Sequence, residues 1–258
     1  MDTHDFAKAQ GHWILARMGK KVLRPGGKEL TQKLIHALDI QSQDNLVEFA
    51  PGLGYTASLA LARKPYSYIG VDADQDAINL LKQKLHGERI AFTLGNAAHT
   101  QIETQSKEKV YGEAMLTMHA DHRKSEIIRE AHRILKPGGL YAIHELGLYP
   151  NELPEDAKAA IQRDLALSIK VNARPLTEAE WTKLLENEGF KVRKVVTNPM
   201  HLLEFSRLLD DEGLFGTVKI IFNICRHADA RKRILQMRRI FRKNMQHMNA
   251  IAIIAEKL

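Results

Sequence analysis

Short apolar segments with a strand pattern alternate with amphipathic helical segments along about the first three quarters of this chain. The strand-like segments are 45–49, 66–71, 90–94, 110–118, 140–146 and 192–197, and the helical segments are 29–38, 55–63, 74–85, 122–135 and 177–189. Parallel strands need helical crossovers, so strands that alternate with helices form a parallel sheet with helices on both faces. The alternation therefore predicts a doubly wound α/β fold.

The end of the chain departs from this alternation. Residues 249–256 are apolar and contain no Gly or Pro, which predicts one more strand. The segment 199–247 before it is far longer than an ordinary connection and carries apolar residues at helical spacing. We therefore predict a mostly parallel seven-stranded sheet with a helical insertion, 199–247, that serves as a substrate lid. The predicted core domain is 29–198 plus 248–258, and residues 1–28 are a leader that also covers the site.

Length and cysteine usage limit the class of protein further. A chain of 258 residues can bury one large core with a modest insertion. Its single cysteine, Cys225, excludes an internal disulfide framework and a multi-thiolate metal site, and we expect its side chain to be buried. The first ten residues carry acids where a secretory signal carries basic residues, and no apolar run is long enough to span a bilayer. These features predict a cytoplasmic protein with no metal.

A glycine-containing turn follows the first predicted strand. Glu48 lies on that strand, and Gly52 and Gly54 lie in the turn before the next helix, where glycine lets a backbone approach a ligand closely. The second strand ends in Asp72, a carboxylate placed to bind both hydroxyls of a ribose. The turn lacks the G-x-G-x-x-G spacing of dinucleotide dehydrogenases. The two features together predict a nucleoside-containing ligand at the carboxyl edge of the sheet.

Residues 46–146 resemble the class I S-adenosylmethionine-dependent methyltransferases, which have a Rossmann-like fold. The family's first motif, an acid followed by alternate glycines, falls on Glu48, Ala50, Gly52 and Gly54, with Ala50 in place of the first glycine. The third-strand motif Gly-Asp-Ala reads Gly95-Asn96-Ala97, and the string 133–139, Arg-Ile-Leu-Lys-Pro-Gly-Gly, is the most specific match. The resemblance implies S-adenosylmethionine as methyl donor, S-adenosylhomocysteine as product, and a cofactor site made of Glu48, Ala50, Pro51, Gly52, Gly54, Asp72, Ala73, Asn96 and Ala97.

Candidate residues for the methyl acceptor follow from the same resemblance. Methyl transfer is an in-line displacement, so the protein has to align donor and acceptor, and a base is needed only if the acceptor arrives protonated. The family's acceptor pocket begins where the fourth strand ends, which makes His119 our first candidate base and Glu145, on the fifth strand, the second. Strand alternation places His144 and Glu145 on opposite faces. The predicted pocket residues are His12, Trp13, Met118 and Tyr149.

Basic residues concentrate in the predicted insertion. Between Arg226 and Lys243 there are eight Lys and Arg residues and a single acid, Asp229. Such a segment is typical of a surface for RNA phosphates, for anionic lipid or for an acidic substrate, or of a solvated helix face. The chain lacks the Asp/Asn-Pro-Pro-aromatic motif of base-amino methyltransferases and reads Leu-Thr-Met-His at 116–119 instead. We therefore predict a small-molecule or lipid-like acceptor and do not favour nucleic acid. The alternatives are an RNA methyltransferase and a non-catalytic S-adenosylmethionine-binding protein, and the sequence predicts no oligomeric state.

Overall fold

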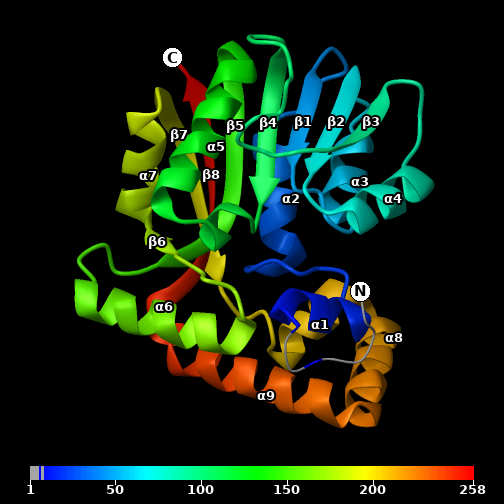
Figure 1. Ribbon diagram of the computed structural model, residues 1–258, viewed down its shortest axis with the longest axis vertical. Coiled ribbons are helices and arrows are strands. Elements are labelled where there is room, and N and C mark those ends of the chain that lie inside the picture. Colours follow the sequence, from blue (N-terminus) through cyan, green and yellow to red (C-terminus); the bar gives the residue numbers. More distant parts are fainter. Residues whose placement is uncertain (1–5, 7–8) are drawn as a thin grey trace.

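A mostly parallel eight-stranded sheet organises the computed structural model, which describes residues 6 and 9–258 (Figure 1). Its strand order is β3-β2-β1-β4-β5-β8-β7, with the short β6 paired beside β5. The strands are β1 Asn45–Phe49, β2 Ser67–Asp72, β3 Ile90–Leu94, β4 Lys107–Glu113, β5 Leu135–Leu148, β6 Leu176–Thr177, β7 Phe190–Pro199 and β8 Met248–Lys257. β8 runs antiparallel to both of its neighbours, β5 and β7. The predicted doubly wound α/β sheet with its last strand after a helical insertion is confirmed, and β6 adds a two-residue eighth strand.

Helices connect most of these strands. They are α1 Gly11–Arg17, α2 Gly27–Ala37, α3 Tyr55–Leu61, α4 Gln75–Lys84, α5 Asp121–Ile134, α6 Glu155–Ile169, α7 Glu178–Asn187, α8 Phe205–Arg226 and α9 Ala228–Lys243, with short 3-10 helices η1 Leu116–Met118 and η2 Met245–His247. The predicted strand 110–118 is too long, because the chain turns at Ala114, whose φ is 53°, and continues as η1. No element is predicted between 147 and 176, where α6 forms.

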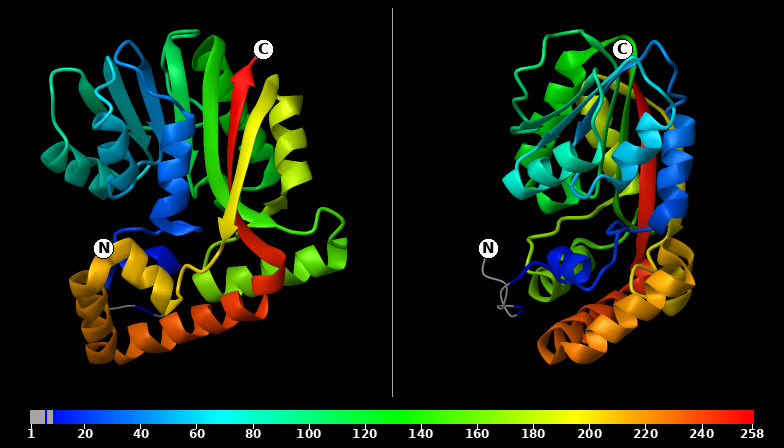
Figure 2. Two further views of the ribbon diagram at one scale, coloured as in Figure 1. Left: turned by 180° about the vertical axis from the view of Figure 1, so that it is seen from behind. Right: turned by 90° about the vertical axis from the view of Figure 1, so that its right-hand side faces the viewer.

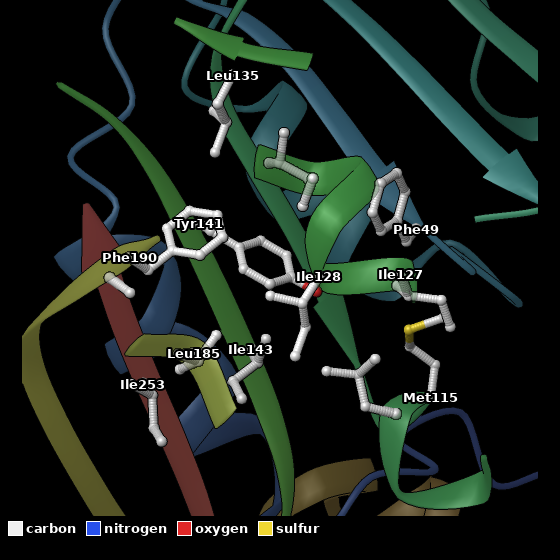
Figure 3. Close-up of a cluster of buried hydrophobic side chains, with 14 of the residues drawn as sticks. Phe49, Met115, Ile127, Ile128, Leu135, Tyr141, Ile143, Leu185, Phe190 and Ile253 are labelled. Atoms are coloured by element: carbon white, nitrogen blue, oxygen red, sulfur yellow. The ribbon is translucent and has the colours of Figure 1, made fainter. Parts of the chain in front are cut away.

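Two hydrophobic clusters cover the two faces of the sheet. On one face α5 and α7 pack on the central strands through side chains that include Ile127, Ile128, Ala131, Ile134 and Leu185, drawn in part in Figure 3. On the other face α2, α3 and α4 bury a second set of aliphatic and aromatic side chains. The apolar stripe predicted for the helix 122–135 is thus the buried face of α5. Burial of both faces makes the sheet a rigid base for the groups at its carboxyl edge.

Four helices, α1, α6, α8 and α9, lie together below the carboxyl edge of the sheet (Figures 1 and 2). We call them the helical cap. Leu15 of α1, Leu165 of α6, Ile220 of α8 and Met237 of α9 belong to one buried apolar cluster, which also includes Leu146 and Leu148 of β5. Residues 1–5 and 7–8 of the predicted leader lie outside the described residues. None of the helices described has an apolar stretch long enough to cross a bilayer.

Candidate cofactor and acceptor site

The turn after β1 and the end of β2 are joined by the carboxylate of Asp72. Its Oδ2 accepts a hydrogen bond of 3.0 Å from the Gly52 amide, and its Oδ1 accepts one of 2.9 Å from the Asp74 amide. Asp74 in turn caps α4, because its side chain accepts from the amides of Asp76 and Ala77. A carboxylate has about four lone-pair sites. Each oxygen of Asp72 therefore retains acceptor capacity for a ligand hydroxyl at the carboxyl edge.

Glycine is required in the β1 turn for two different reasons. Gly52 has φ 53°, and a Cβ at this position would meet no atom closer than the Ala50 carbonyl oxygen at 4.0 Å, so the turn is open on that side. Gly54 has φ 80°, and a Cβ there would lie 2.6 Å from a methyl group of Leu81. The first glycine leaves room above the turn, and the second allows α3 to start close against α4.

Glu48, which the resemblance assigns to the cofactor site, is a buried residue of β1. Its Oε2 accepts hydrogen bonds from the hydroxyls of Tyr68 at 2.5 Å and Tyr111 at 2.8 Å. Burial raises the pKa of Glu48 to about 7, although the two tyrosine hydrogen bonds act in the opposite direction. Because this oxygen already accepts two hydrogen bonds within the protein, a role for Glu48 toward a cofactor stays a prediction.

The raised pKa of Glu48 makes a prediction about the stability of the fold. Because the folded-state pKa lies above the ordinary value of 4.5, ionisation of Glu48 lowers stability as the pH rises from about 4.5 to about 7. Glu48→Gln keeps a neutral acceptor beside the tyrosines, so we expect its free energy of unfolding at pH 8 to stay within about 1 kcal/mol of the parent or to exceed it. Urea unfolding at pH 5 and pH 8 measures this, and a loss confined to pH 8 would contradict it.

Asn96 lies just beyond β3, where its amide oxygen already has two donors. It accepts from the Ala98 amide at 3.0 Å and from the guanidinium of Arg123 at 2.6 Å. Recognition of an adenine amino group by this oxygen would have to displace or share these donors. Ala73 and Ala97 flank Asp72 and Asn96 in the chain. Their place in the cofactor site, like that of Asn96, stays a prediction.

A largely apolar cavity of ≈ 80 Å³ lies between the sheet edge and the helical cap. A cavity of about 10–15 Å³ holds one water molecule, so this larger cavity can hold part of an organic molecule. Apart from His12 and Thr117, its side chains are apolar. The lining residues are Gly11, His12, Leu15, Leu23, Pro25, Ala114, Thr117, Met118, Leu146, Leu165, Ile169, Ala173, Met200, Leu202, Met237 and Phe241.

Of the predicted pocket residues, His12 and Met118 line this cavity. Burial lowers the pKa of the His12 imidazole, and the nearby carboxylate of Asp74 raises it to a smaller extent. Trp13 does not line the cavity but lies beside His12, with 5.3 Å between the ring centroids. Of the predicted pocket residues, His12 is therefore the one with a titratable side chain in the cavity lining.

The structure places Glu145 and Tyr149 outside the lining of this cavity, so a role for either residue in the site stays a prediction. Glu145 is fully buried and accepts hydrogen bonds from the amides of Met115, Leu116 and Thr117 and from the Thr117 hydroxyl, so its carboxylate holds η1 in place and does not reach the cavity. The Tyr149 hydroxyl donates to the Met245 carbonyl, outside the cavity lining. His119 follows η1 and also lies outside the lining.

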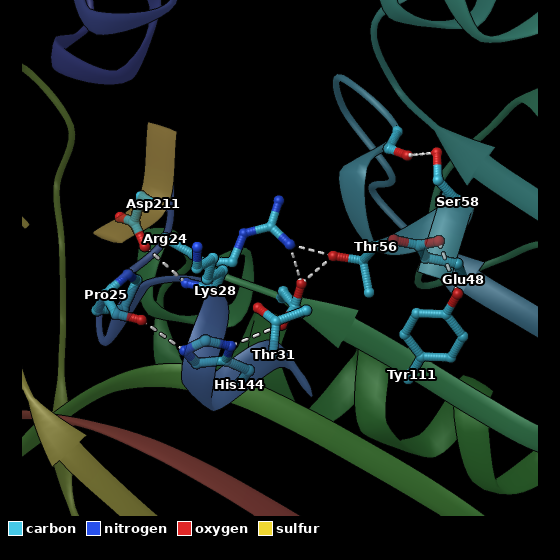
Figure 4. Close-up of polar contacts among 12 residues, drawn as sticks. Arg24, Pro25, Lys28, Thr31, Glu48, Thr56, Ser58, Tyr111, His144 and Asp211 are labelled. Carbon is cyan, nitrogen blue, oxygen red and sulfur yellow. Dashed lines mark hydrogen bonds and ion pairs between the residues drawn. The ribbon is translucent and has the colours of Figure 1, made fainter. Parts of the chain in front are cut away.

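A buried polar cluster missing from the sequence-based predictions lies beside the cavity (Figure 4). Glu113, at the end of β4, accepts hydrogen bonds from Arg24, Thr56, Thr31 and, at 2.6 Å, the Nδ1 of His144. The other ring nitrogen of His144 is 2.6 Å from the Pro25 carbonyl oxygen. Although burial acts in the opposite direction, Arg24 and His144 lower the pKa of Glu113 to about 2. The cluster holds the segment that carries Leu23 and Pro25 into the cavity wall.

Comparisons with known proteins agree with this architecture. A methyltransferase-domain family model matches residues 46–139. An uncharacterized protein of Haemophilus influenzae is 34% identical over 257 residues, covering 96% of this chain and 98% of the relative. Methyltransferase GfsG of Streptomyces halstedii is 24% identical over 212 residues, covering 76% of this chain and 73% of GfsG.

Solved structures show the same fold at low sequence identity. The cyclopropane synthase MmaA2 from Mycobacterium tuberculosis aligns with a TM-score of 0.73 and 13% identity, covering 98% of both chains. A phosphoethanolamine N-methyltransferase of Haemonchus contortus, in complex with phosphomonomethylethanolamine and S-adenosylhomocysteine, aligns with a TM-score of 0.72 and 16% identity, covering 96% of this chain and 57% of that one.

Sheet order, glycine turn and family match together define a methyltransferase domain. Residues 46–139 belong to the class I S-adenosylmethionine-dependent methyltransferase family, whose methyl donor is S-adenosylmethionine.

Proposed function

We propose that this protein methylates a small, largely apolar or lipid-like acceptor bound in the cavity under the helical cap. The observation that carries the proposal is the cavity lining, which offers aliphatic and aromatic surface with only His12 and Thr117 as polar side chains. Such a surface favours an apolar acceptor body and fixes its orientation through few polar contacts. When bound, S-adenosylmethionine supplies a methyl group on a positively charged sulfur.

The residues at the carboxyl edge fit the nucleoside part of this cofactor. Asp72 offers acceptor capacity on both carboxylate oxygens, which suits two adjacent ribose hydroxyls, and the open side of Gly52 leaves space for a ligand against the turn. We propose that Asp72 and the turn 50–54 hold the cofactor there. The helical cap would exclude water from the acceptor, which favours a displacement between two aligned partners.

We propose that His12 orients the acceptor and takes up its proton where the acceptor arrives protonated. Its lowered pKa keeps the imidazole neutral near pH 7, so a ring nitrogen can accept a proton. It lines the cavity, whereas His119 does not, and this difference makes His12 the stronger candidate.

The RNA alternative is less well supported, because several cations of the basic segment are already engaged. Arg238 and Arg242 pair with Glu204, and Lys243 pairs with Asp164. Arg233 is buried and donates to the Ala9 carbonyl. These side chains are held by the protein itself, which leaves fewer of them for a phosphate backbone.

The function is tested by calorimetric titration followed by an acceptor screen. We expect saturable binding of S-adenosylmethionine and S-adenosylhomocysteine, with NAD as the negative control. Label from methyl-tritiated S-adenosylmethionine should then pass to a component of a small-molecule or lipid extract. Transfer to RNA would favour the RNA methyltransferase, and tight cofactor binding with no transfer to any extract would favour the non-catalytic binding protein.

For the acceptor identified in this way, we expect His12→Ala to lower kcat by about 100-fold, as for the loss of a general base. The affinity for S-adenosylhomocysteine should stay unchanged, because His12 lines the acceptor cavity. His36→Ala is the matched control, since His36 is an exposed histidine on α2. Weaker cofactor binding at an unchanged kcat would show that His12 covers the cofactor instead.

A further inference from the structure

The second half of α8 exposes an unusual amount of apolar surface. Leu214 is 64% exposed, Phe215 89%, Val218 58%, Ile221 40% and Phe222 56%. We call these five side chains the α8 apolar face. Single exposed apolar residues are common on proteins, but a contiguous group of large ones marks an interaction surface.

The orientation of α8 shows that this face is not part of the protein core. Thr217 and Ile220, on the opposite side of the helix, are buried against the rest of the cap. At about 100° per residue, the five exposed side chains occupy an arc of about 120°, the width of the apolar stripe in an amphipathic helix. Cys225 continues this stripe and is exposed, so its predicted burial is wrong. The helix thus has two apolar sides, and this chain covers only one of them.

Exposed cations flank one side of the α8 apolar face. Lys219 and Arg226 are exposed along one border of it, and the Arg226 guanidinium lies 5.4 Å from the centroid of the Phe222 ring. Arg231, Lys232 and Arg239 are exposed on α9. Within the described part of the chain, none of these five cations forms an ion pair, and Asp229 is the single acid between 213 and 243. Phe and Leu side chains bordered by Lys and Arg are the composition of helices that lie in the surface of an anionic membrane.

The fold presents this surface outward. Figures 1 and 2 show that α8 and α9 meet at a corner of the helical cap away from the sheet. The turn between them is at His227, next to Arg226. A flat bilayer can therefore approach this corner without contacting the sheet.

We propose that the α8 apolar face and its flanking cations dock this protein on an anionic bilayer surface. A second copy of the chain fits less well, because a two-fold contact through this face would bring Lys219 and Arg226 of both copies together. RNA would use the cations but would leave Phe215 and Leu214 in water. Insertion of these side chains among lipid chains, with the cations at the phosphate level, uses both features. The proposal does not depend on the identity of the methyl acceptor.

Vesicle flotation tests the proposal with the full chain. We expect binding to vesicles made of equal parts phosphatidylglycerol and phosphatidylcholine, and much weaker binding to pure phosphatidylcholine. The double variant F215S/F222S should lower the vesicle affinity at least about tenfold, since it removes two large side chains from the inserted surface. K219Q/R226Q should lower affinity for the anionic vesicles and leave the weak binding to the neutral ones unchanged.

Leu167→Ser is the control, because Leu167 is a 65% exposed apolar residue on α6, outside this face. It should bind vesicles as the parent does. Absence of binding to anionic vesicles, or equal binding by F215S/F222S, would overturn the proposal. Sedimentation analysis of the same variants tests whether the α8 apolar face binds a second copy of the chain instead. A parent dimer that F215S/F222S converts to a monomer would assign the face to a second copy of the chain and would also overturn it.

Discussion

Glu113→Gln is expected to destabilise the fold by about 3–5 kcal/mol, the usual cost of removing one partner from a buried ion pair. Glu113 accepts hydrogen bonds from Arg24, Thr31, Thr56 and His144, and its side chain is only 5% exposed. Without its charge, the Arg24 guanidinium and the His144 ring lose their anionic partner in a site with little access to water. Urea unfolding at pH 7 measures the effect as a lower midpoint.

The pH dependence separates this electrostatic role from simple packing. The folded-state pKa of Glu113, about 2, lies below the ordinary value of 4.5, so its contribution is fully present above about pH 4.5 and is lost as the pH falls toward 2. A shift of this size corresponds to about 3 kcal/mol. The difference in unfolding free energy between parent and Glu113→Gln should therefore shrink between pH 5 and pH 3.

An exposed ion pair supplies the control for this experiment. Glu126 pairs with Arg123 at 2.6 Å on the surface of α5, and Glu126→Gln should leave the unfolding midpoint nearly unchanged because water screens this pair. If Glu113→Gln lowers the unfolding midpoint no more than Glu126→Gln does, the buried polar cluster around Glu113 does not hold the segment that carries Leu23 and Pro25. If the difference from the parent stays constant with pH, the loss comes from packing and not from the charge.

The sheet was accessible to sequence reasoning because its signals are local. The predicted strands 45–49 and 90–94 coincide with β1 and β3, and a capping box of Thr177 and Glu180 begins α7 within the predicted helix 177–189. Each signal depends on side-chain alternation or on residues three apart in the chain. The family match spans the same region, residues 46–139.

The helical cap was harder to predict because its contacts join distant parts of the chain. α6 buries Ile161 and Leu165 but exposes Leu167, so its apolar residues do not form one clear stripe. The apolar residues of α8 suggest burial, yet most of them face solvent. A pattern of apolar residues tells which helix faces avoid water, but it cannot tell whether the protein's own core or a partner covers them.

The polar residues of β5 also show that contacts with distant parts of the chain cannot be predicted from local sequence patterns. Alternation correctly places His144 and Glu145 on opposite faces of β5. The partners of each side chain depend on the tertiary structure. His144 contacts Pro25 and Glu113, whereas Glu145 accepts hydrogen bonds from the amides at η1. No spacing along the chain relates Pro25 to residue 144. The sequence therefore offers Glu145 as a candidate catalytic group without showing that its carboxylate accepts hydrogen bonds from Met115, Leu116 and Thr117.

Asp72→Asn is expected to weaken binding of S-adenosylmethionine by about 5- to 150-fold, or about 1–3 kcal/mol, the range for losing hydrogen bonds to a charged group. The proposed contact is with ribose hydroxyls, which S-adenosylmethionine and S-adenosylhomocysteine share. Calorimetry should therefore show the same loss for both ligands.

Two comparisons make this result specific to the ribose contact. Asp76→Asn removes the same charge from the exposed first turn of α4 and should leave both affinities within about twofold, because surface charges are screened by solvent. Asp72 also holds the amides of Gly52 and Asp74, so the unfolding temperature of each variant has to be measured beside its affinity.

A loss restricted to S-adenosylmethionine would mean that Asp72 acts on the positive charge of the sulfur, because that charge is the feature S-adenosylhomocysteine lacks. Unchanged affinity for both ligands in a folded Asp72→Asn variant would remove Asp72 from the cofactor site and leave the glycine turn as its main element.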